Sequence, residues 1–258
     1  MIRALLETLT QAGIGNDACL IVHSSFRRLG KSIRAQALCE TLMEHCHNGN
    51  VIMPTMTWRT VNATSPNFDI VNTASHTGAL TEVFRTEYGQ YRSKHPTHSV
   101  SCWGKDADKL TATHHLDPSP CSAQSPYGII ENSQLKDNAF IVLIDVGLES
   151  CTYMHYFEEM YAPSVFLNPE IEHYNLLENN TPIDKVTCQR HTSLPRNFHF
   201  ALDYLIPEKD YSVNCIGDAV VTIIKLDRLS RILHSAFKRS DTATHSPNTY
   251  QNYYRNSK

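Results

Sequence analysis

The chain alternates between two hydrophobic periods up to Pro54, and this alternation restricts the fold more than any other feature. Apolar side chains recur at a helical spacing in residues 2–12 and again in residues 35–46. Residues 18–22 and 51–53 are short continuous apolar runs, and Pro54 ends the second run. Helical and strand periods in this order are typical of a sheet whose strands are joined by crossover helices. We therefore expect an α/β fold.

The remainder of the chain continues this pattern, with one weaker region. Residues 140–144 read as a buried strand, and residues 226–237 have the spacing of an amphipathic helix. Between about residues 163 and 210 strands and loops alternate weakly, which indicates a small, less regular β-rich insertion. Residues 239–258 are polar and offer little to bury, so we expect a disordered tail. The sequence thus predicts a single domain over residues 1–238.

The composition argues against several classes of protein. Hydrophobic residues make up 41% of the chain, which is enough for a packed core. The formal net charge of −3 leaves no basic surplus for nucleic-acid binding. No apolar run reaches the roughly 18 residues that a membrane span requires, and the N-terminus does not resemble a signal peptide. The eight cysteines are scattered without a C-x-x-C pair, as expected for reduced thiols in the cytoplasm.

A histidine and a carboxylate lie at the start of a predicted helix. The strand at residues 140–144 is followed by a turn and by a helix that opens near Thr152. In α/β proteins ligands bind beyond the carboxyl ends of such strands. His155 and Glu158 share one helix face, and a carboxylate beside an imidazole fixes the tautomer that a general base requires. On spacing alone, an ordinary surface pair is the better interpretation.

The end of the first predicted strand is a second candidate for ligand binding. His23, Ser24 and Ser25 follow the apolar run, and small hydroxyls at this edge can approach a ligand closely. A capped turn without a ligand explains the same residues equally well.

The densest polar cluster runs from Arg92 to Ser99. Pro96 keeps this segment out of a helix. His95 and His98 would point to opposite faces of an extended segment, so they are a poor metal-binding pair. A loop that touches substrate or cofactor fits the cluster, and so does a structural loop.

Residues 119–128 form a polar turn whose prolines could present Ser125 and Tyr127, although an ordinary turn fits as well. Cys121 and Cys151 could be thiol nucleophiles beside a histidine. Neither has the local signature of a known cysteine hydrolase, so buried inert thiols fit better. The chain has no G-x-G-x-x-G, P-loop or G-x-S-x-G motif, which disfavours a dinucleotide-binding dehydrogenase, a kinase and an α/β-hydrolase.

The order of the polar segments is more informative than each segment alone. In chain order they are Val22–Gly30, Val51–Trp58, Gly78–Arg85, Arg92–Val100, Ser125–Gly128, Gly147–Thr152 with His155 and Glu158, and Ile216–Ala219. This series resembles the aminoglycoside 3-N-acetyltransferase family, an antibiotic N-acetyltransferase family that lacks the GNAT fold. The resemblance spans roughly residues 2–238, and its R-S-x-H-P-x-H-S and T-x-x-H-x-x-E blocks are the most specific parts.

The resemblance implies a three-layer α/β/α sandwich with a mostly parallel central sheet. It also implies acetyl-CoA as the donor and direct transfer to an amine of an aminosugar, with no covalent acyl-enzyme and no metal. His155 would be the base, Glu158 would support it, and His23 would lie near the reacting centre. A further set of residues would line the CoA channel: Ser24, Ser25, Ser99, Ser125 and Tyr127.

Two departures from the family pattern affect the predicted site. Residues 33–36 stand where the family often has two glycines, so Lys31 and Arg34 are the candidates for contact with the CoA phosphates. Asp145 stands where the family usually has glycine, which places a charge near the end of a strand.

The acceptor pocket is the least defined part of the prediction. Aminoglycosides are polycations, so a pocket for them should be acidic. The acidic candidates are Asp69, Asp145, Glu149, Glu158 and Glu159, and His95 is a further substrate-binding candidate. An amino- or nucleotide-linked sugar fits equally well as the acceptor. Both carboxylates of the helix are within reach of His155, so its partner is also open.

Three functions are compatible with the sequence. The first is a cytoplasmic acyl-CoA-dependent N-acyltransferase that acts on a small amine acceptor. The second is a hydrolase with a Cys/His site or a metal-bound water, and the third is a non-catalytic relative that binds a sugar. We expect neither a nucleic acid nor a membrane as a partner. The acyl group, and the choice between a monomer and a homodimer, stay open.

Overall fold

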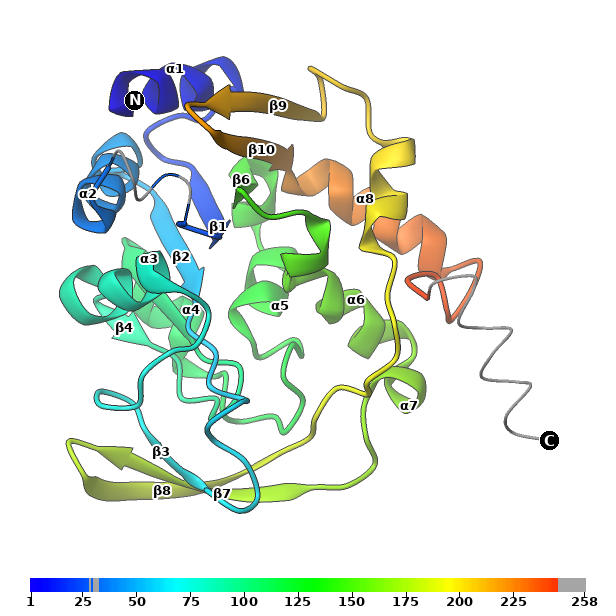
Figure 1. Cartoon of the computed structure of the whole chain (residues 1–258). Helices are drawn as coiled ribbons and strands as arrows, with labels where there is room; N and C mark the ends of the chain where they lie inside the picture. Colours follow the sequence, from blue (N-terminus) through cyan, green and yellow to red (C-terminus); the bar gives the residue numbers. More distant parts are fainter. Residues whose placement is uncertain (28, 30–32, 246–258) are drawn as a thin grey trace.

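A seven-stranded sheet forms the centre of the computed structural model, which describes residues 1–27, 29 and 33–245 (Figure 1). The strand order is β4-β5-β2-β1-β6-β10-β9. The three central strands run parallel, and the strands on either side of them pair antiparallel. The strands are β1 (Cys19–Ser24), β2 (Asn50–Pro54), β4 (Tyr91–Arg92), β5 (Val100–Gly104), β6 (Ala139–Ile144), β9 (Tyr211–Ile216) and β10 (Ala219–Lys225).

Helices cover both faces of this sheet and bury two separate apolar layers. One face carries α1 (Ile2–Gln11), α2 (Ala35–His45) and α3 (Ala79–Val83), which continues as a π-helical turn over Phe84–Tyr88. The other face carries α4 (Ala107–Ala112), α5 (Pro126–Glu131), α6 (Tyr153–Tyr161) and α8 (Leu226–Phe237). Figure 1 shows α1 and α2 on one side of the sheet and α6 and α8 on the other. The α/β/α layering expected from the sequence is confirmed.

The alternation of side chains along β1 explains why the sheet needs two helical layers. Cys19 and Ile21 pack with the helices of one face, whereas Leu20 and Val22 pack with those of the other. A strand that is apolar on both faces must be covered on both faces, which favours parallel pairing with crossover helices. The prediction of a parallel sheet accordingly holds for β2, β1 and β6, which occupy the interior.

A local capping interaction starts α5 inside a segment that the sequence presented as a loop. The Ser125 hydroxyl accepts a hydrogen bond from the backbone N–H of Gly128, and Pro126 occupies the first helical position. Both features are preferred at helix N-termini, because a serine satisfies a free N–H and a proline has none.

A second, three-stranded sheet confirms the small β-rich region. It has the order β3-β7-β8 and consists of β3 (Asn67–Asp69), β7 (Glu172–Glu178) and β8 (Thr181–Cys188). A small apolar cluster around Phe68, Tyr174 and Leu176 stabilises it. The helix α7 (Pro163–Phe166) precedes this hairpin, and a 3₁₀ segment (Phe198–Tyr204) follows it. The pairing of β3 with β7 was not predicted, because β3 belongs to the polar segment between β2 and α3.

The small sheet lies beyond the carboxyl ends of β1 and β2, whose arrows point toward it in Figure 1. From β8 the chain returns along the side of the molecule that carries α6 and α8 (Figure 1). Among the described residues, no helix is both long and apolar enough to cross a membrane.

Candidate active site

A cavity of about 710 Å³ opens at the carboxyl edge of the central strands. His23 and Ser24 at the end of β1, residues 54–59 after β2 and residues 146–155 after β6 form much of its wall. The returning segment, residues 190–196, closes the opposite side. Segments that follow parallel strands meet at one edge of a sheet, which is where ligands bind in this class of fold.

His155 and Glu158 form a close pair in this wall. The Nδ1 of His155 lies 2.7 Å from the Oε2 of Glu158, and the Glu158 side chain is completely buried. Because the carboxylate accepts a hydrogen bond from Nδ1, the lone pair of the neutral imidazole sits on Nε2. The ring of His155 lines the cavity. This ring can therefore take a proton from a bound molecule, and Glu158 rather than Glu159 is its partner.

Two residues far along the chain complete the surroundings of Glu158. The Nε of Arg196 lies 3.0 and 2.9 Å from the two carboxylate oxygens, and the Thr244 hydroxyl donates to Oε1 at 2.5 Å. Burial alone would raise the pKa of Glu158, but His155 and Arg196 outweigh it, so the pKa is lowered. Glu158 thus stays ionised where it can stabilise a charged imidazole.

Thr244 falls in the segment that the sequence analysis assigned to a disordered tail. Its side chain is fully buried, and its carbonyl accepts a hydrogen bond from the backbone N–H of Asn197. Ordered structure therefore continues at least to residue 245, past the predicted boundary at residue 238. Residues 246–258 lie outside the described part of the chain.

A second histidine stacks on His155. The ring centroids of His155 and His191 are 4.4 Å apart with an interplanar angle of 26°. The Nε2 of His191 lies 2.6 Å from Glu159, which also accepts hydrogen bonds from the Ser119 hydroxyl and the Cys121 backbone N–H. Burial, followed by the nearby His155, holds the pKa of His191 well below its usual value. His191 therefore stays neutral beside His155.

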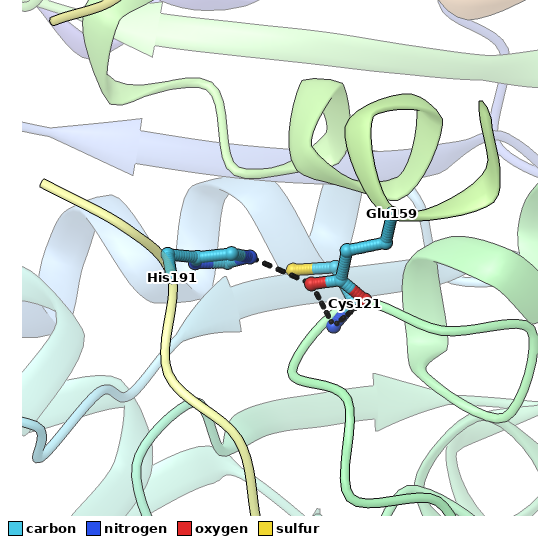
Figure 2. A group of neighbouring side chains, drawn as sticks. All are labelled: Cys121, Glu159 and His191. Carbon is cyan, nitrogen blue, oxygen red and sulfur yellow. Dashed lines mark hydrogen bonds and ion pairs between the residues drawn. The ribbon is translucent and has the colours of Figure 1, made fainter. Parts of the chain in front are cut away.

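The donor set of Cys121, Glu159 and His191 has the composition of a metal site. One ligand atom from each residue lies within 4.8 Å of the others, and the three side chains converge in Figure 2. The hydrogen bonds that Glu159 accepts already account for this proximity. Burial and the neighbouring Glu159 raise the pKa of the Cys121 thiol well above its usual value. Because Glu159 already has hydrogen-bond partners in His191, Ser119 and Cys121, the cluster fits a hydrogen-bonded support.

Both cysteines considered as nucleophiles are fully buried thiols. Cys121 and Cys151 have no exposed surface, and burial raises the pKa of Cys151 to about 12. Neither residue lines the cavity. A protonated thiol without access to a substrate is a weak nucleophile.

His23 and Ser24 present polar atoms to the cavity that are free to bind a ligand. The Nε2 of His23 and the Oγ of Ser24 are buried and have no hydrogen-bond partner among the described residues. Burial, and secondarily His155, lowers the pKa of His23 to about 4, so its ring is neutral near pH 7. A neutral imidazole and a hydroxyl can both donate to a carbonyl oxygen.

The Arg92-to-Ser99 cluster mainly braces the wall from behind. Arg92 donates to the backbone carbonyls of Thr55, Ile70 and Thr73, and the Ser99 hydroxyl donates to the same Thr55 carbonyl. The Nδ1 of His95 accepts a hydrogen bond from the backbone N–H of His98. Neither His95 nor Ser99 lines the cavity, whereas His98 does.

Four other residues predicted to contact CoA do not line the cavity: Ser25, Arg34, Ser125 and Tyr127. Ser125 caps α5, and Tyr127 in the first turn of that helix is fully buried. Ser25 is half-buried beside β6, and Arg34 is exposed at the start of α2. Lys31 lies outside the described residues.

Most of the acidic residues that were predicted to form the acceptor pocket do not line the cavity. Asp69 accepts hydrogen bonds from the backbone of Val71, Asn72 and Asn180, which stabilises a turn. Asp145 does not line the cavity and has a φ of 55°, in the left-handed region that glycine adopts most easily. This backbone shape explains why a glycine suits the position.

Three of the residues around His155 and Glu158 escaped prediction: His191, Arg196 and Thr244. They lie in the weakly patterned segment or in the polar C-terminal segment, and none belongs to a recognisable motif. The concentration of Arg190, His191 and Arg196 in one short stretch was the only available indication.

Known proteins resemble the chain in sequence and in structure. A model of the family described as aminoglycoside 3-N-acetyltransferase matches residues 21–238. The SPbeta prophage-derived aminoglycoside N(3')-acetyltransferase-like protein YokD of Bacillus subtilis (strain 168) is 24% identical over 178 residues. That match covers 59% of this chain and 62% of YokD, so it spans less than two thirds of the relative.

Three solved structures share the fold. The crystal structure of YokD has a TM-score of 0.76 at 18% identity and covers 93% of this chain and 94% of that chain. The aminoglycoside acetyltransferase AAC(3)-IVa apoenzyme has a TM-score of 0.74 at 20% identity, with 96% and 92% covered. AAC-IIIb in a binary complex with CoASH has a TM-score of 0.72 at 16% identity, with 96% and 98% covered.

The buried histidines predict a pH-dependent stability. The pKa values of His23 and His114 fall to about 4, and those of His95 and His98 lie well below the usual 6.5. As the pH falls below 6.5 the unfolded chain takes up protons that the folded chain resists. Stability is thus present above pH 6.5 and lost below it, by about 1.4 kcal/mol per pH unit for each histidine.

Urea unfolding at pH 7.5 and pH 5.5 measures this loss. His114→Gln should reduce the difference in the free energy of unfolding between the two pH values by the contribution of one histidine, because it removes the fully buried imidazole. The exposed His47 provides the control, since His47→Gln should leave the dependence unchanged. Equal free energies of unfolding at the two pH values would contradict the prediction.

Proposed function

The chain belongs to the aminoglycoside 3-N-acetyltransferase family, and we propose that it transfers the acetyl group of acetyl-CoA directly to an amine of a small acceptor, with His155 as the general base. The observation that carries this proposal is the hydrogen bond from His155 Nδ1 to the buried Glu158. Because this bond uses Nδ1, the basic nitrogen of the cavity-lining ring is Nε2. The likeness to a CoASH-bound enzyme supports acetyl-CoA as the donor.

His155 would act at the step in which the amine attacks the thioester. The amine nitrogen forms a bond to the carbonyl carbon while its proton passes to Nε2 of His155. The C–S bond then breaks, and the imidazolium returns the proton to the sulfur of CoA. Glu158 stabilises the transient imidazolium because it stays a carboxylate. General base catalysis of this kind contributes about 10²- to 10⁴-fold in rate.

The carbonyl oxygen becomes an oxyanion during the same step and needs hydrogen-bond donors. His23 and Ser24 offer a neutral imidazole and a hydroxyl with unpartnered atoms at the end of β1. Donors that are already fixed by the fold stabilise an oxyanion without reorganising. We assign these two side chains to that role.

CoA itself would occupy the part of the cavity near β1 and α3. The hydroxyls of Ser24, Thr77 and Thr81 line this part. They can accept from or donate to the amide groups and phosphates of CoA.

His191 would hold His155 in position. Its ring stacks on His155 and is itself fixed by Glu159, Ser119 and the backbone of Cys121. A neutral ring in this place restricts the orientation of His155 without opposing its protonation.

Replacement of His155 tests the assignment of the base. We expect His155→Ala to lower kcat by at least about 100-fold, because it removes the cavity-lining imidazole whose tautomer Glu158 fixes. Release of free CoA thiol in the presence of an amine acceptor measures the rate. His47→Ala, which removes an exposed histidine, is the control. A wild-type rate in a folded His155→Ala protein would disprove the assignment.

The Thr244 hydroxyl should support the reaction through Glu158. Thr244→Val keeps the shape of the side chain and removes the donor, and we expect kcat to fall about three- to tenfold with little change in KM. Thr242→Val, in the same segment, is the matched control, because the Thr242 hydroxyl pairs with the Ser240 hydroxyl and not with Glu158. Equal kcat values for the two variants would show that the hydroxyl has no part in the reaction.

A hydrolase with a metal-bound water is the second candidate function, because one possible metal ligand set lies in the structure: Cys121, Glu159 and His191. We expect dialysis against a chelator to leave CoA release unchanged, because the Glu159 carboxyl group is already hydrogen-bonded to Ser119, the Cys121 backbone and His191. Elemental analysis of the purified protein accompanies the assay. One zinc per chain, together with loss of activity on its removal, would favour the hydrolase instead.

A further inference from the structure

The charged side chains that line the cavity are not those expected for a polycationic acceptor. Three are arginines, Arg59, Arg190 and Arg196, and Glu149 is the one acidic side chain among the lining residues of the described chain. The other predicted acidic groups either lie away from the cavity or pair behind its wall. The cavity therefore lacks the several carboxylates that several ammonium groups would need.

Two of the three arginines are already neutralised. The Nε of Arg190 lies 2.7 Å from Glu172, and its other nitrogens donate to the carbonyls of Trp58 and Val61. The Nε of Arg196 lies 2.9 Å from Glu158. Each of these two guanidinium groups is paired with a carboxylate, although the Nη2 of Arg196 has no hydrogen-bond partner among the described residues. The most exposed charged side chains that a ligand meets are therefore Arg59 and Glu149.

Arg59 is placed to bind an anion. It is exposed, and no carboxylate pairs with it among the described residues. Its guanidinium carbon lies 5.0 Å from the centroid of the Trp58 ring, and Trp58 packs edge-on against His76 with 4.7 Å between centroids. An arginine held over an aromatic ring keeps its N–H edge free for a phosphate or a carboxylate.

Glu149 supplies one negative charge on the His155 side of the cavity. Its carboxylate accepts hydrogen bonds from the backbone N–H of Gly147 and from His199, yet 61% of the side chain is exposed. It precedes α6, which carries His155. A single carboxylate in this place suits a single ammonium group that approaches the base.

We propose that the acceptor carries both an amine and an anionic group, as an aminosugar phosphate or a nucleotide-linked aminosugar does, and that Arg59 binds the anion while Glu149 attracts the amine. This inference rests on the proposed function. It makes Arg59 a specificity-determining residue, which favours an anionic acceptor and repels a polycation.

CoA also carries phosphates, so the test must separate the two substrates. The rate of CoA thiol release is measured with glucosamine, glucosamine 6-phosphate, UDP-glucosamine and sisomicin, and KM is determined separately for acetyl-CoA. We expect kcat/KM for at least one phosphorylated acceptor to exceed that for glucosamine and for sisomicin by about tenfold. Arg59→Gln should raise KM for that acceptor about tenfold and leave KM for acetyl-CoA and for glucosamine unchanged.

Two further variants sharpen the result. Arg239→Gln removes another exposed arginine that does not line the cavity, so it controls for the change in net charge. Arg59→Glu should shift the preference toward sisomicin. A wild-type preference for sisomicin, or an Arg59→Gln effect on KM for acetyl-CoA alone, would overturn the inference and leave the acetyltransferase proposal intact.

If none of the four amines is acetylated, calorimetry with the same compounds decides the question in the presence of CoA. Glucosamine 6-phosphate or UDP-glucosamine should bind about tenfold more tightly than glucosamine, and Arg59→Gln should abolish the difference. Equal affinities would overturn the inference. By contrast, CoA release that is insensitive to His155→Ala would count against the proposed function itself.

Discussion

The buried carboxylate of Glu158 is the interaction on which the site depends. It joins His155 on α6, Arg196 on the returning segment and Thr244 near the end of the described chain. An ionised carboxylate without partners in a protein interior costs several kcal/mol, so all three segments have to be in place before it can stay charged. The geometry of the proposed site and the packing of the last segment are therefore parts of one arrangement.

The parallel centre of the sheet determines where this arrangement forms. The strands β2, β1 and β6 end at the same edge, and the segments that follow them supply most of the cavity wall. Apolar side chains on both faces of these strands pack against two helical layers, so the wall rests on the buried core. The returning segment then closes the open side.

The periodicity of the sequence was sufficient to predict the layers and most of the strands, because burial on both faces of a strand leaves a strong local pattern of apolar residues. The pairing of His155 with Glu158 followed from helical spacing and from the family resemblance. His191 and Arg196 could not be predicted in the same way, since their partners lie 32 and 38 residues away and their own segment has no regular pattern. Ser125 and Asp69 show the opposite error: they are conspicuous polar residues whose side chains satisfy nearby backbone groups.

The position of Thr244 has a practical consequence for anyone who expresses this protein. A recombinant version that stops at residue 238, where both the family match and the hydrophobic pattern end, would retain both sheets and every helix of the described chain. It would nevertheless lack the hydroxyl that touches Glu158. Such a protein could pass every test of solubility and secondary structure and still give a misleadingly low rate, so C-terminal tags and truncations should be placed beyond residue 245.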